Sequence, residues 1–538
     1  MIVAVEGCCH GELDAIYASL ALAEEQTGTK VDLLLICGDF QAVRNAADLA
    51  GMACPPKYRS MHDFHKYYSG EKVAPVLTIF IGGNHEASAH LAGLHHGGWA
   101  APKIYYLGFA GVVRVGGLRI GGLSGIYNGR HYRLGHYEVP PFSDDDMRSF
   151  YHVRELDVLR VMQLRQPMDV FISHDWPQHI ARHGDTAHLV RRKAFLKKEI
   201  DDGSLGSPPG MQLLQHLQPR YWFCAHLHVK FAAVVGHASG NATRFLSLSK
   251  CLPGSDFLQL LRIDGDGIGS DGSVPVISYD AEWIAVLRAT QHLHSSVRQR
   301  LPLDPASVAL ASGGRNSFTP TEEELQAVRE CVGGASGGSE EIDISEESDA
   351  PAAASDAPDP FAMPLNFAIS APPYREGESI HAPQEPLQEN QQTTAFIQKF
   401  GLERNFRVQR GATLDVAGAR GGGSIPFTTP QPPPALPPPP SALPPPPSGH
   451  GAQASHGYFG DPAGYAPPPQ GVPSYVPLPH HMPPPPPFYD PAGYAPRPLT
   501  RPPPGPPIAF HPGAQAAGTA DPMFAPMPLD EEIDLDDD

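Results

Sequence analysis

The N-terminal half of the chain alternates short apolar runs with polar turns, a pattern that predicts strands buried on both faces. Val, Ile, Leu and Phe dominate these runs, and glycine or histidine follows each of them within two residues, so each strand should end sharply. Five runs share this pattern, at 1–5, 31–37, 76–81, 168–173 and 221–225. We therefore predict five buried strands.

Helical spacing appears between the first two strands and again near residue 280. Apolar residues recur on one helical face at Leu13, Ile16, Tyr17, Leu20 and Ala23. A second helix is expected over 280–293. Apolar residues alternate at 230–235 and 243–248, which predicts strands that close a second sheet, and 258–263 continues the apolar pattern. The expected class is α/β, built as an α+β sandwich of two sheets.

Composition restricts the part of the 538 residues that can fold, because the 61 Pro and 54 Gly are unevenly spread. From about 333 to 390 the chain is acidic and rich in Ser, Ala and Pro, too poor in apolar residues to fold alone. Residues 416–538 form a low-complexity tail in which Asp-Pro-Ala-Gly-Tyr-Ala-Pro occurs at 461 and at 490. We expect this tail to be disordered and either to bind polyproline-binding domains or to act as a passive linker.

The charge distribution argues against a globally basic nucleic-acid surface. Residues 1–300 carry 29 basic and 29 acidic residues, so the net charge of −19 lies entirely after Arg300. DNA is therefore not an expected partner, and phosphate binding has to come from a local patch or from metal ions. Seven cysteines, an odd number, and no apolar run of about 18 residues favour a soluble, intracellular, reduced chain without a membrane partner.

Potential metal ligands follow all five predicted strands. In chain order they are Cys8 and His10, Asp39, Asn84, His174, and His226 and His228. Side chains beyond the carboxyl ends of strands in an α/β sheet can converge on one site. Asp39 can bridge two cations through its two oxygens, and a mixture of oxygen, nitrogen and sulfur donors suits first-row divalent metals. Scattered core histidines and polar turns would have to explain all five strand ends at once, so we predict a metal centre.

The order of these residues resembles the calcineurin-like dinuclear metallophosphoesterase superfamily. The segments Gly-Cys-Cys-His-Gly-Glu, Gly-Asp-Phe-Gln-Ala-Val-Arg-Asn and Ala-His-Leu-His-Val-Lys-Phe are similar to the RNA lariat debranching enzymes over roughly residues 1–290. The resemblance implies a two-sheet metallophosphoesterase sandwich flanked by helices, followed by a family C-terminal domain to which a helical segment at 391–401 would belong. It also implies hydrolysis of the 2′,5′-phosphodiester at the branch point of excised intron lariats.

The resemblance further implies that the seven residues named above hold two divalent metal ions. The superfamily usually has aspartate where this chain has Cys8. A thiolate is a softer ligand than a carboxylate, so Fe(II) or Zn(II) should be preferred over Mg(II), with Mn(II) also expected to support activity. Cys9 is the other candidate thiol, but Cys8 matches the family pattern, and Cys9 is expected to pack inward.

His85 is the expected catalytic residue outside the ligand set. Two metals would supply a hydroxide, whereas a 2′-oxygen leaving group needs a proton, and His85 next to Asn84 is the natural general acid. Glu86 and Asp175 either orient histidines or cap helix N-termini. His95 and His96, in a glycine-flanked loop, are expected at the surface.

An irregular stretch over 124–154 corresponds to the lariat recognition loop of the family. Its interleaved aromatic and basic residues suit base stacking and phosphate contact on a branched RNA, and they are Tyr127, Arg130, Tyr132, Arg133 and Tyr137. A solvated loop with incidental tyrosines is the alternative. The family usually has cysteine before Pro140, where this chain has Val139, so no role of that thiol is carried over.

These observations give a map of three parts. A metallophosphoesterase domain is expected over 1–235, a debranching-type C-terminal domain with a disordered acidic insertion over 236–415, and the tail over 416–538. Branched lariat RNA is the expected partner and the nucleus the expected location, although no convincing basic import cluster is visible. The alternatives are a metallophosphoesterase acting on nucleotides or phosphoproteins, and a splicing-associated scaffold that uses its Pro-rich tail.

Overall fold

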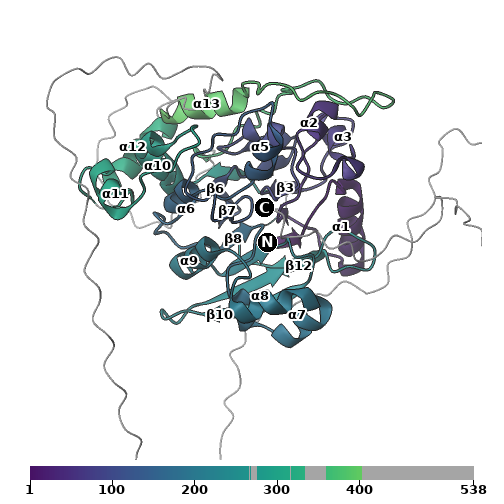
Figure 1. Cartoon of the computed structure of the whole chain (residues 1–538), viewed down its shortest axis with the longest axis horizontal. Helices are drawn as coiled ribbons and strands as arrows, with labels where there is room; N and C mark the ends of the chain where they lie inside the picture. The colour runs from purple at the N-terminus through teal and green to yellow at the C-terminus, as the bar shows by residue number, and fades with distance from the viewer. Residues whose placement is uncertain (266, 268–274, 316, 334–358, 403–538) are drawn as a thin grey trace, which may run out of the picture. The chain divides into compact units, whose positions relative to one another are not determined.

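Two β-sheets stacked face to face form the centre of the computed structural model, which describes residues 1–265, 267, 275–315, 317–333 and 359–402 (Figure 1). The predicted tail at 416–538 and residues 334–358 of the acidic insertion lie outside this part. Both sheets and the helices on them come from the described residues. The predicted two-sheet sandwich is therefore what the structure shows.

The first sheet has six strands in the order β12-β1-β2-β3-β5-β4. β1, β2, β3 and β5 are parallel neighbours, whereas β12 pairs antiparallel with β1 at one side and β4 antiparallel with β5 at the other. The strand bounds are β1 Ile2–Glu6, β2 Leu33–Ile36, β3 Leu77–Phe80, β4 Gly98–Ala101, β5 Ile104–Tyr106 and β12 Leu258–Arg262.

The second sheet has seven strands in the order β10-β11-β9-β8-β7-β6-β13. Its centre is parallel, from β11 through β9 and β8 to β7. The strand bounds are β6 Ala110–Val115, β7 Leu118–Leu123, β8 Val170–Ser173, β9 Tyr221–Cys224, β10 Phe231–Gly236, β11 Ala242–Ser247 and β13 Ile277–Tyr279.

Alternating side chains of the central strands build separate apolar layers. In β2, Leu33 and Leu35 face the second sheet and pack in a cluster with Ile172 and Phe223, whereas Leu34 and Ile36 pack on the other side of the sheet. All four residues of β2 are buried, as predicted for a strand covered on both faces. Removing such a side chain from water is worth roughly 1.5–3 kcal/mol, so the apolar runs read from the sequence stabilise both layers.

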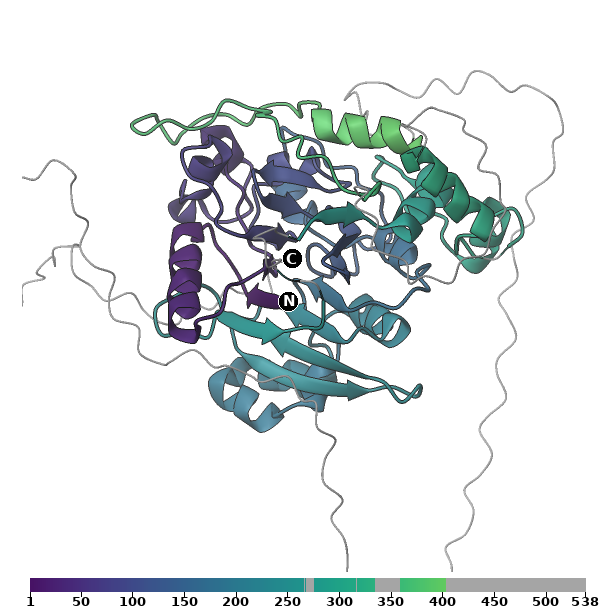
Figure 2. The ribbon, with the colours of Figure 1, turned by 180° about the vertical axis from the view of Figure 1, so that it is seen from behind.

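Helices cover the outer faces of both sheets (Figures 1 and 2). Against the first sheet pack α1 (Leu13–Thr27), α3 (Phe64–Tyr68) and α4 (Ser88–Ala92), with α2 (Ala46–Ala50) nearby. Against the second pack α6 (Glu155–Val161), α7 (Thr186–Arg192), α8 (Lys197–Asp202), α9 (Pro208–Leu217), α10 (Ala281–Thr290), α12 (Glu322–Gly333) and α13 (Gln391–Phe400). The remaining helices are α5 (Asp144–Ser149), α11 (Pro305–Ala311) and the 3-10 turns Pro56–Tyr58, Ile180–His183, Ala194–Leu196 and Gln291–Leu293. Among the described helices, none has the length and apolarity needed to cross a lipid bilayer.

Residues 359–390 form a strap along the domain, which corrects the expectation that the whole acidic insertion is disordered. The strap begins beside β13, where Met363 donates its backbone amide to Ile277 over 2.9 Å. It continues past Tyr68, whose hydroxyl accepts the amide of Ala371 over 2.8 Å, and reaches α13 at the top of the views in Figures 1 and 2. Hydrogen bonds and a few apolar side chains, such as the buried Met363 and the partly buried Phe367, hold this segment on the two sheets.

The division expected after residue 235 does not separate two folding units. β11 lies between β9 and β10 in the second sheet, and β12 pairs with β1 in the first, so strands after residue 235 complete both sheets. Five further strands were missing from the prediction, namely β4, β5, β6, β7 and β13. Their runs are short or interrupted by glycine, which weakens the apolar signal.

Candidate metal centre

Every predicted ligand lies on a loop that follows the carboxyl end of a strand. In chain order, β1, β2, β3, β8 and β9 lead to Cys8 and His10, Asp39, Asn84, His174, and His226 and His228. The first three strands belong to one sheet and the last two to the other. The site therefore lies where the ends of two stacked sheets meet.

Asp39 lies between two groups of these ligands. Its Oδ2 atom is 3.6 Å from Nε2 of His10, and its Oδ1 atom is 3.3 Å from Nε2 of His174. The side chain of Asp39 is only 1% exposed. A buried carboxylate whose two oxygens face separate imidazoles is arranged to bridge two cations.

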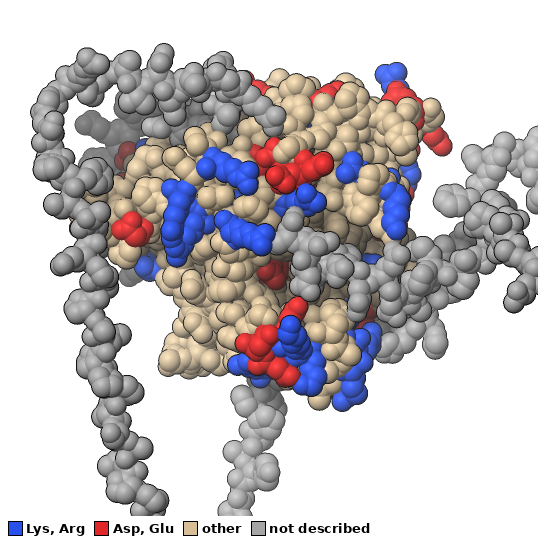
Figure 3. Space-filling model, viewed as in Figure 1, with Lys and Arg blue, Asp and Glu red and all other residues tan. Residues whose placement is uncertain are grey.

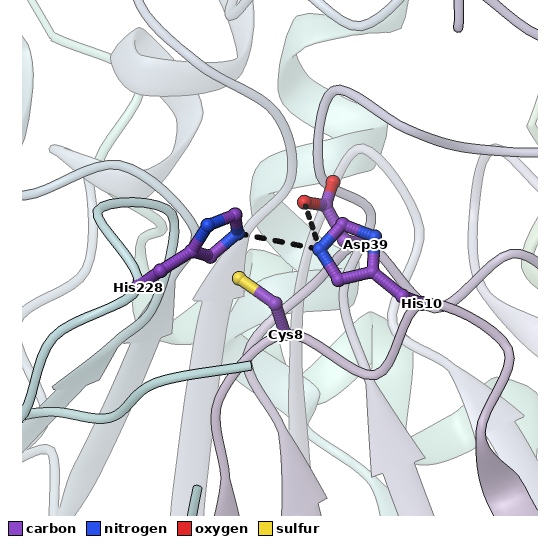
Figure 4. Close-up of side chains that lie close together, drawn as sticks. All are labelled: Cys8, His10, Asp39 and His228. Atoms are coloured by element: carbon purple, nitrogen blue, oxygen red, sulfur yellow. Dashed lines mark hydrogen bonds and ion pairs between the residues drawn. The ribbon is translucent and has the colours of Figure 1, made fainter. Parts of the chain in front are cut away.

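The first group consists of Cys8, His10, Asp39 and His228. One ligand atom from each of them lies within 4.8 Å of the others. The Nε2 atoms of His10 and His228 are 3.3 Å apart, and Figure 4 shows the sulfur, the carboxylate and both rings gathered around one point. Sulfur, nitrogen and oxygen donors gathered this closely fit one first-row divalent ion.

The second group consists of Asn84, His174 and His226 with the other oxygen of Asp39. Oδ1 of Asn84 is 3.2 Å from Nε2 of His174, and the rings of His174 and His226 are 5.1 Å apart. Nδ1 of His174 donates to the carbonyl of Cys37 over 2.8 Å. This bond fixes the tautomer of His174 and leaves Nε2 free to bind a cation. The seven predicted ligands thus form two adjacent groups that share Asp39.

Four of the ligand residues have left-handed backbones. The φ angles are +47° at His10, +48° at Asp39, +65° at His226 and +48° at His228. This conformation is uncommon for residues other than glycine and costs of order 1–3 kcal/mol at each position. Its repetition after three strands, β1, β2 and β9, marks the region as one where the position of the side chains matters more than local stability.

Two glycines allow the ligand loops to approach one another. A Cβ atom on Gly83 would lie 2.2 Å from Oδ1 of Asp39, and one on Gly38 would lie 2.3 Å from Nδ1 of His174. Neither distance is possible between non-bonded atoms, so any larger residue would push the ligands apart. The glycines after β2 and β3 are therefore required by the site itself.

Glu86 holds the backbone around Asp39, which differs from both roles considered for it. Its carboxylate accepts the amides of Phe40, Gln41 and Gly83 over 2.7, 2.8 and 2.9 Å. It therefore neither orients a histidine nor caps a helix. Burial, and then the charge of Asp39, raises the pKa of Glu86 to about 8.

Asp175 connects the second group to the expected recognition loop. Its Oδ2 atom accepts the backbone amide of Tyr127 over 3.1 Å, again a role other than orienting a histidine or capping a helix. Burial raises the pKa of Asp175 to about 6. Because Asp175 follows His174 directly, this bond ties the start of the loop to a ligand residue.

Three of the four predicted histidine ligands have lowered pKa values that suit metal binding, whereas at His174 the charge of Asp39 outweighs burial and raises the pKa. Burial, which is the main cause, lowers the pKa of His10 to about 4, that of His226 to about 3 and that of His228 to about 2. Their nitrogens are therefore neutral and available as ligands near pH 7. Burial also raises the pKa of the Cys8 thiol well above its ordinary value, so a cation is needed to stabilise the thiolate.

Burial opposes ionisation of Asp39 as well, but the neighbouring His174 and His85 outweigh it. They hold the pKa of the Asp39 carboxyl well below its ordinary value. Asp39 is therefore negatively charged at neutral pH, which suits a carboxylate that would bridge two cations.

His85 lies beside both groups without joining either. Its backbone amide donates to Oδ1 of Asp39 over 2.8 Å, and its ring is 5.6 Å from that of His10. The side chain is half-buried at the edge of the cluster. This placement keeps His85 close to the bridging carboxylate with its imidazole free for another role.

Other residues singled out from the sequence lie outside the metal groups. Cys9 is fully buried in the apolar layer beside α1, as expected. His95 and His96 are partly buried, which corrects their expected surface position, because α13 covers them and Phe396 lies 5.5 Å from the ring of His96. Burial lowers the pKa of His95 to about 4.

Four of the five predicted recognition residues line one open cavity of about 480 Å³. They are Tyr127, Arg130, Tyr132 and Arg133. Arg300 from the expected C-terminal domain joins them, and the flanking segment is paired with the loop: Leu301 donates its amide to Arg133 over 2.9 Å. No sequence pattern singled out Arg300, because its place depends on this long-range pairing.

Tyr137 faces a different environment from the other four. Its hydroxyl lies 3.0 Å from Oγ of Ser149, and the guanidinium groups of Arg154 and Arg298 lie 5.7 and 5.2 Å from its ring centre. Tyr137 is half-buried and does not line the cavity. These contacts pack Tyr137 within the loop, outside the cavity that the other four residues line.

Gln41 is a further residue of the site that the sequence did not indicate. Its Nε2 atom is 3.3 Å from Nδ1 of His10, and its backbone also has a positive φ, of +60°. With the amide turned so that its oxygen accepts from Nδ1–H, Gln41 would fix the tautomer that leaves Nε2 of His10 free for a cation. The Gly-Asp-Phe-Gln segment contained this residue, but its spacing alone assigns it no role.

The two sheets and the gathered ligand residues are the features of a metal-dependent phosphoesterase. Residues 1–230 match the family described as calcineurin-like phosphoesterase. Residues 240–405 match the C-terminal domain of lariat debranching enzyme. The chain belongs to the lariat debranching enzyme family.

Relatives from animals and plants share this similarity. The lariat debranching enzyme of Homo sapiens is 47% identical over 417 residues, which cover 76% of this chain and 71% of that protein. The Arabidopsis thaliana enzyme is 55% identical over 289 residues, covering 54% and 68%. The Drosophila melanogaster enzyme is 48% identical over 366 residues, covering 61% and 68%.

Proposed function

We propose that this chain hydrolyses the 2′,5′-phosphodiester at the branch point of excised intron lariat RNA and so linearises introns for turnover during mRNA processing. The observation that carries the proposal is the position of Asp39, whose two oxygens face His10 and His174 at 3.6 and 3.3 Å. A shared carboxylate between two donor groups suits phosphodiester hydrolysis with two metals. Family membership supplies the substrate class.

Two divalent metal ions are the proposed cofactors, either Fe(II) or Zn(II), or Mn(II). Cys8, His10, Asp39 and His228 would hold one, and Asn84, His174, His226 and Asp39 the other. When bound, the pair would supply a hydroxide nucleophile and polarise the phosphate. The sulfur of Cys8 favours the softer of these metals at the first position.

The leaving 2′-oxygen needs a proton, and His85 is the residue placed to give it. Its backbone amide donates to Asp39, while its half-buried imidazole belongs to neither group of predicted metal ligands. A donor positioned in this way typically contributes about 10²–10⁴-fold to a rate. His85 is therefore the proposed general acid.

The cavity beside Asp175 is the proposed site for the RNA around the branch. Tyr127 and Tyr132 offer aromatic faces for bases, and Arg130, Arg133 and Arg300 offer guanidinium groups for phosphates. Figure 3 shows basic side chains gathered over α6 and the adjoining strands β6 and β7. The described residues thus include a local basic patch. Phosphate binding needs such a patch because the net charge of residues 1–300 is zero.

The test is cleavage of a branched RNA trinucleotide by the full chain with each divalent metal. We expect the 2′,5′ bond to be cleaved while 3′,5′ bonds remain, and Asp39→Asn to abolish the reaction. Arg130→Ala combined with Arg133→Ala should reduce preference for the branch while sparing a small phosphodiester. Faster hydrolysis of p-nitrophenyl phosphate than of branched RNA would instead favour an enzyme acting on nucleotides or phosphoproteins.

A nuclear location and a polyproline-binding partner are further parts of the proposal. Excised introns arise where splicing occurs, which supports the location. The proline runs of the tail support the partner class, because such runs are the sequences that polyproline-binding domains recognise. A wild-type chain inactive on every phosphoester but retained on splicing complexes through its tail would favour the scaffold function instead.

A further inference from the structure

Lys250 is held beside the first metal-binding group by main-chain bonds on both of its sides. The amide of Cys8 donates to the carbonyl of Ser249 over 3.3 Å, and the amide of Cys251 donates to the carbonyl of Cys8 over 3.2 Å. Lys250 and Cys8 therefore form a parallel bridge. In addition, Oγ of Ser249 donates to the carbonyl of His228 over 3.2 Å. The backbone of Lys250 is thus fixed to the loops of two predicted ligands.

The ammonium group of Lys250 acts on the same end of the site. Burial is the main reason for the low pKa values of His10 and His228, and the positive charge of Lys250 lowers both further. The charge of Lys250 thus acts on both imidazoles, whose Nε2 atoms are 3.3 Å apart. Its charge cannot bind a metal directly, since a protonated amine has no lone pair.

Among the residues that the structure describes, Lys250 has no counter-ion. Its side chain is half-buried, yet within the described residues no carboxylate forms an ion pair with it. Lys230, two residues after His228, shows the contrast, because its Nζ atom lies 3.4 Å from Asp256 and 3.3 Å from Gln259. A partly desolvated ammonium without a partner is unfavourable. Such a charge is explained when a ligand supplies the anion.

We propose that Lys250 binds a phosphate oxygen of the substrate RNA at the Cys8 side of the metal centre. The inference rests on the proposed function, since it assigns the anion to an RNA phosphodiester. The two sources of that anion are the scissile phosphate and a neighbouring phosphate of the same RNA. In either case Lys250 would contribute to substrate binding without being a metal ligand.

The experiment compares Lys250→Met and Lys250→Gln with Lys250→Arg and with the matched control Lys230→Met. Rates are measured on a branched RNA and on bis(p-nitrophenyl) phosphate, and bound metal is measured by elemental analysis. We expect Lys250→Met and Lys250→Gln to lower kcat/KM on branched RNA by roughly 10- to 100-fold, the usual worth of a charge-assisted hydrogen bond. Lys250→Arg should recover most of this loss, and Lys230→Met should remain close to wild type.

The salt dependence of kcat/KM distinguishes a phosphate contact from a merely structural role, because a structural role would leave it unchanged. Loss of one phosphate contact should reduce the slope of log(kcat/KM) against log[salt] by about 0.7 for a single strand. If kcat/KM falls on both substrates, Lys250 contacts the scissile phosphate. If it falls on branched RNA alone, Lys250 contacts a neighbouring phosphate. The proposal is overturned if the neutral variants match Lys230→Met, or if their lost activity follows lost metal.

Failure of the proposed function would look different. A wild-type chain that cleaves bis(p-nitrophenyl) phosphate but not branched RNA would refute the RNA substrate. The comparison of Lys250→Met with Lys230→Met on the small diester would still test whether Lys250 contacts the scissile phosphate.

Discussion

The backbone amide of His226 donates a hydrogen bond to the sulfur of Cys8 over 3.1 Å. This bond joins the loop after β1 in one sheet to the loop after β9 in the other. An amide aimed at sulfur also favours the thiolate over the thiol, against the burial that raises the pKa of Cys8. The first metal-binding group is therefore prepared for a charged sulfur ligand.

Replacing that sulfur should change metal preference more than activity. We expect Cys8→Asp to remain active with Mn(II) but to retain less Fe(II) or Zn(II) after dialysis, because a hard oxygen replaces a soft sulfur. Elemental analysis of the dialysed protein measures the effect. Cys9→Ser is the matched control and should retain metals like wild type, and an unchanged metal preference in Cys8→Asp would refute the softness argument.

The imidazole of His85 can be removed without losing the hydrogen bond between the backbone at this position and Asp39. In His85→Ala the backbone amide that donates to Asp39 is still present, so both metals should stay bound. Turnover of branched RNA should nevertheless fall by about 10²–10⁴-fold, because the proton donor is lost. An activated leaving group, which needs no proton, should react at nearly the wild-type rate. Loss of metal from this variant would instead identify His85 as a ligand.

A buried ion pair at the start of α10 should be important for stability. Arg119 has only 2% of its side chain exposed and donates to both carboxylate oxygens of Asp280 over 2.9 and 2.8 Å. Asp280→Ala leaves that charge with Glu282 as its remaining acidic partner and also removes the N-cap of α10. We expect the free energy of unfolding to fall by about 3–5 kcal/mol, measured by urea denaturation.

The same pair predicts a pH dependence and has a control. Burial opposes ionisation of Asp280, but Arg119 outweighs it and holds the pKa of Asp280 below its ordinary 3.8. The stabilisation is therefore complete above pH 3.8 and is lost as the pH falls through the lower folded-state value, so the variant and wild type should converge in acid. Asp264→Ala, at a carboxylate 91% exposed that pairs with Arg220, should cost no more than about 1 kcal/mol.

His90 should make the folded protein sensitive to mild acid. Burial lowers its pKa from 6.5 to about 3, and Nδ1 donates to the carbonyl of Ala42 over 3.0 Å. Between pH 6.5 and 3 the unfolded chain binds a proton that the folded chain does not, so stability is lost as the pH falls. His90→Phe should lose about 2 kcal/mol less than wild type between pH 7 and pH 5. Denaturation at both pH values tests this, with the exposed His188→Phe expected to follow wild type.

The Pro-rich tail should be dispensable, whereas α13 should not. A chain ending at Arg420 keeps α13, in which Phe396, Ile397 and Phe400 are buried, and should cleave branched RNA at the full rate. A chain ending at Asn390 loses these side chains and the two bonds between Gln392 and the backbone of Trp99. It should unfold several degrees lower in a thermal melt. Full stability of the shorter chain, or inactivity of a folded longer one, would contradict this division.

The sequence predicted the ligand loops well because strong apolar runs mark the strands before them. The strand Leu33–Ile36 is buried on both faces, so its run is entirely apolar. The change to polar residues shortly before Asp39 is therefore easy to recognise. β6 and β7 were missed although Gly116 and Gly117 between them both have positive φ angles, the signature of a tight hairpin turn. The Gly116-Gly117 pair itself was visible in the sequence.

Other features depend on contacts that no local pattern contains. The strap at 359–390 has too few apolar residues to indicate structure by itself, and it is ordered by distant partners such as Tyr68 and Ile277. Similarly, Glu86 was recognised as part of the site, but its role follows from three amides on two different loops. Tyr137 was assigned to base stacking from composition, and its contacts with Ser149, Arg154 and Arg298 could not be predicted from it.

The pairing of β12 with β1 has a consequence for how the chain is made. Cys8 leaves the ribosome first, but its neighbours Lys250 and β12 are synthesised more than 200 residues later. At typical elongation rates of 5–20 residues per second, His228 appears roughly 10 to 40 seconds after Cys8. During that interval the nascent chain carries a thiol and imidazoles that no completed cage protects from oxidation or from the wrong metal. The ligands of the candidate metal centre can therefore come together only after the segment around His228 and β12 has been synthesised.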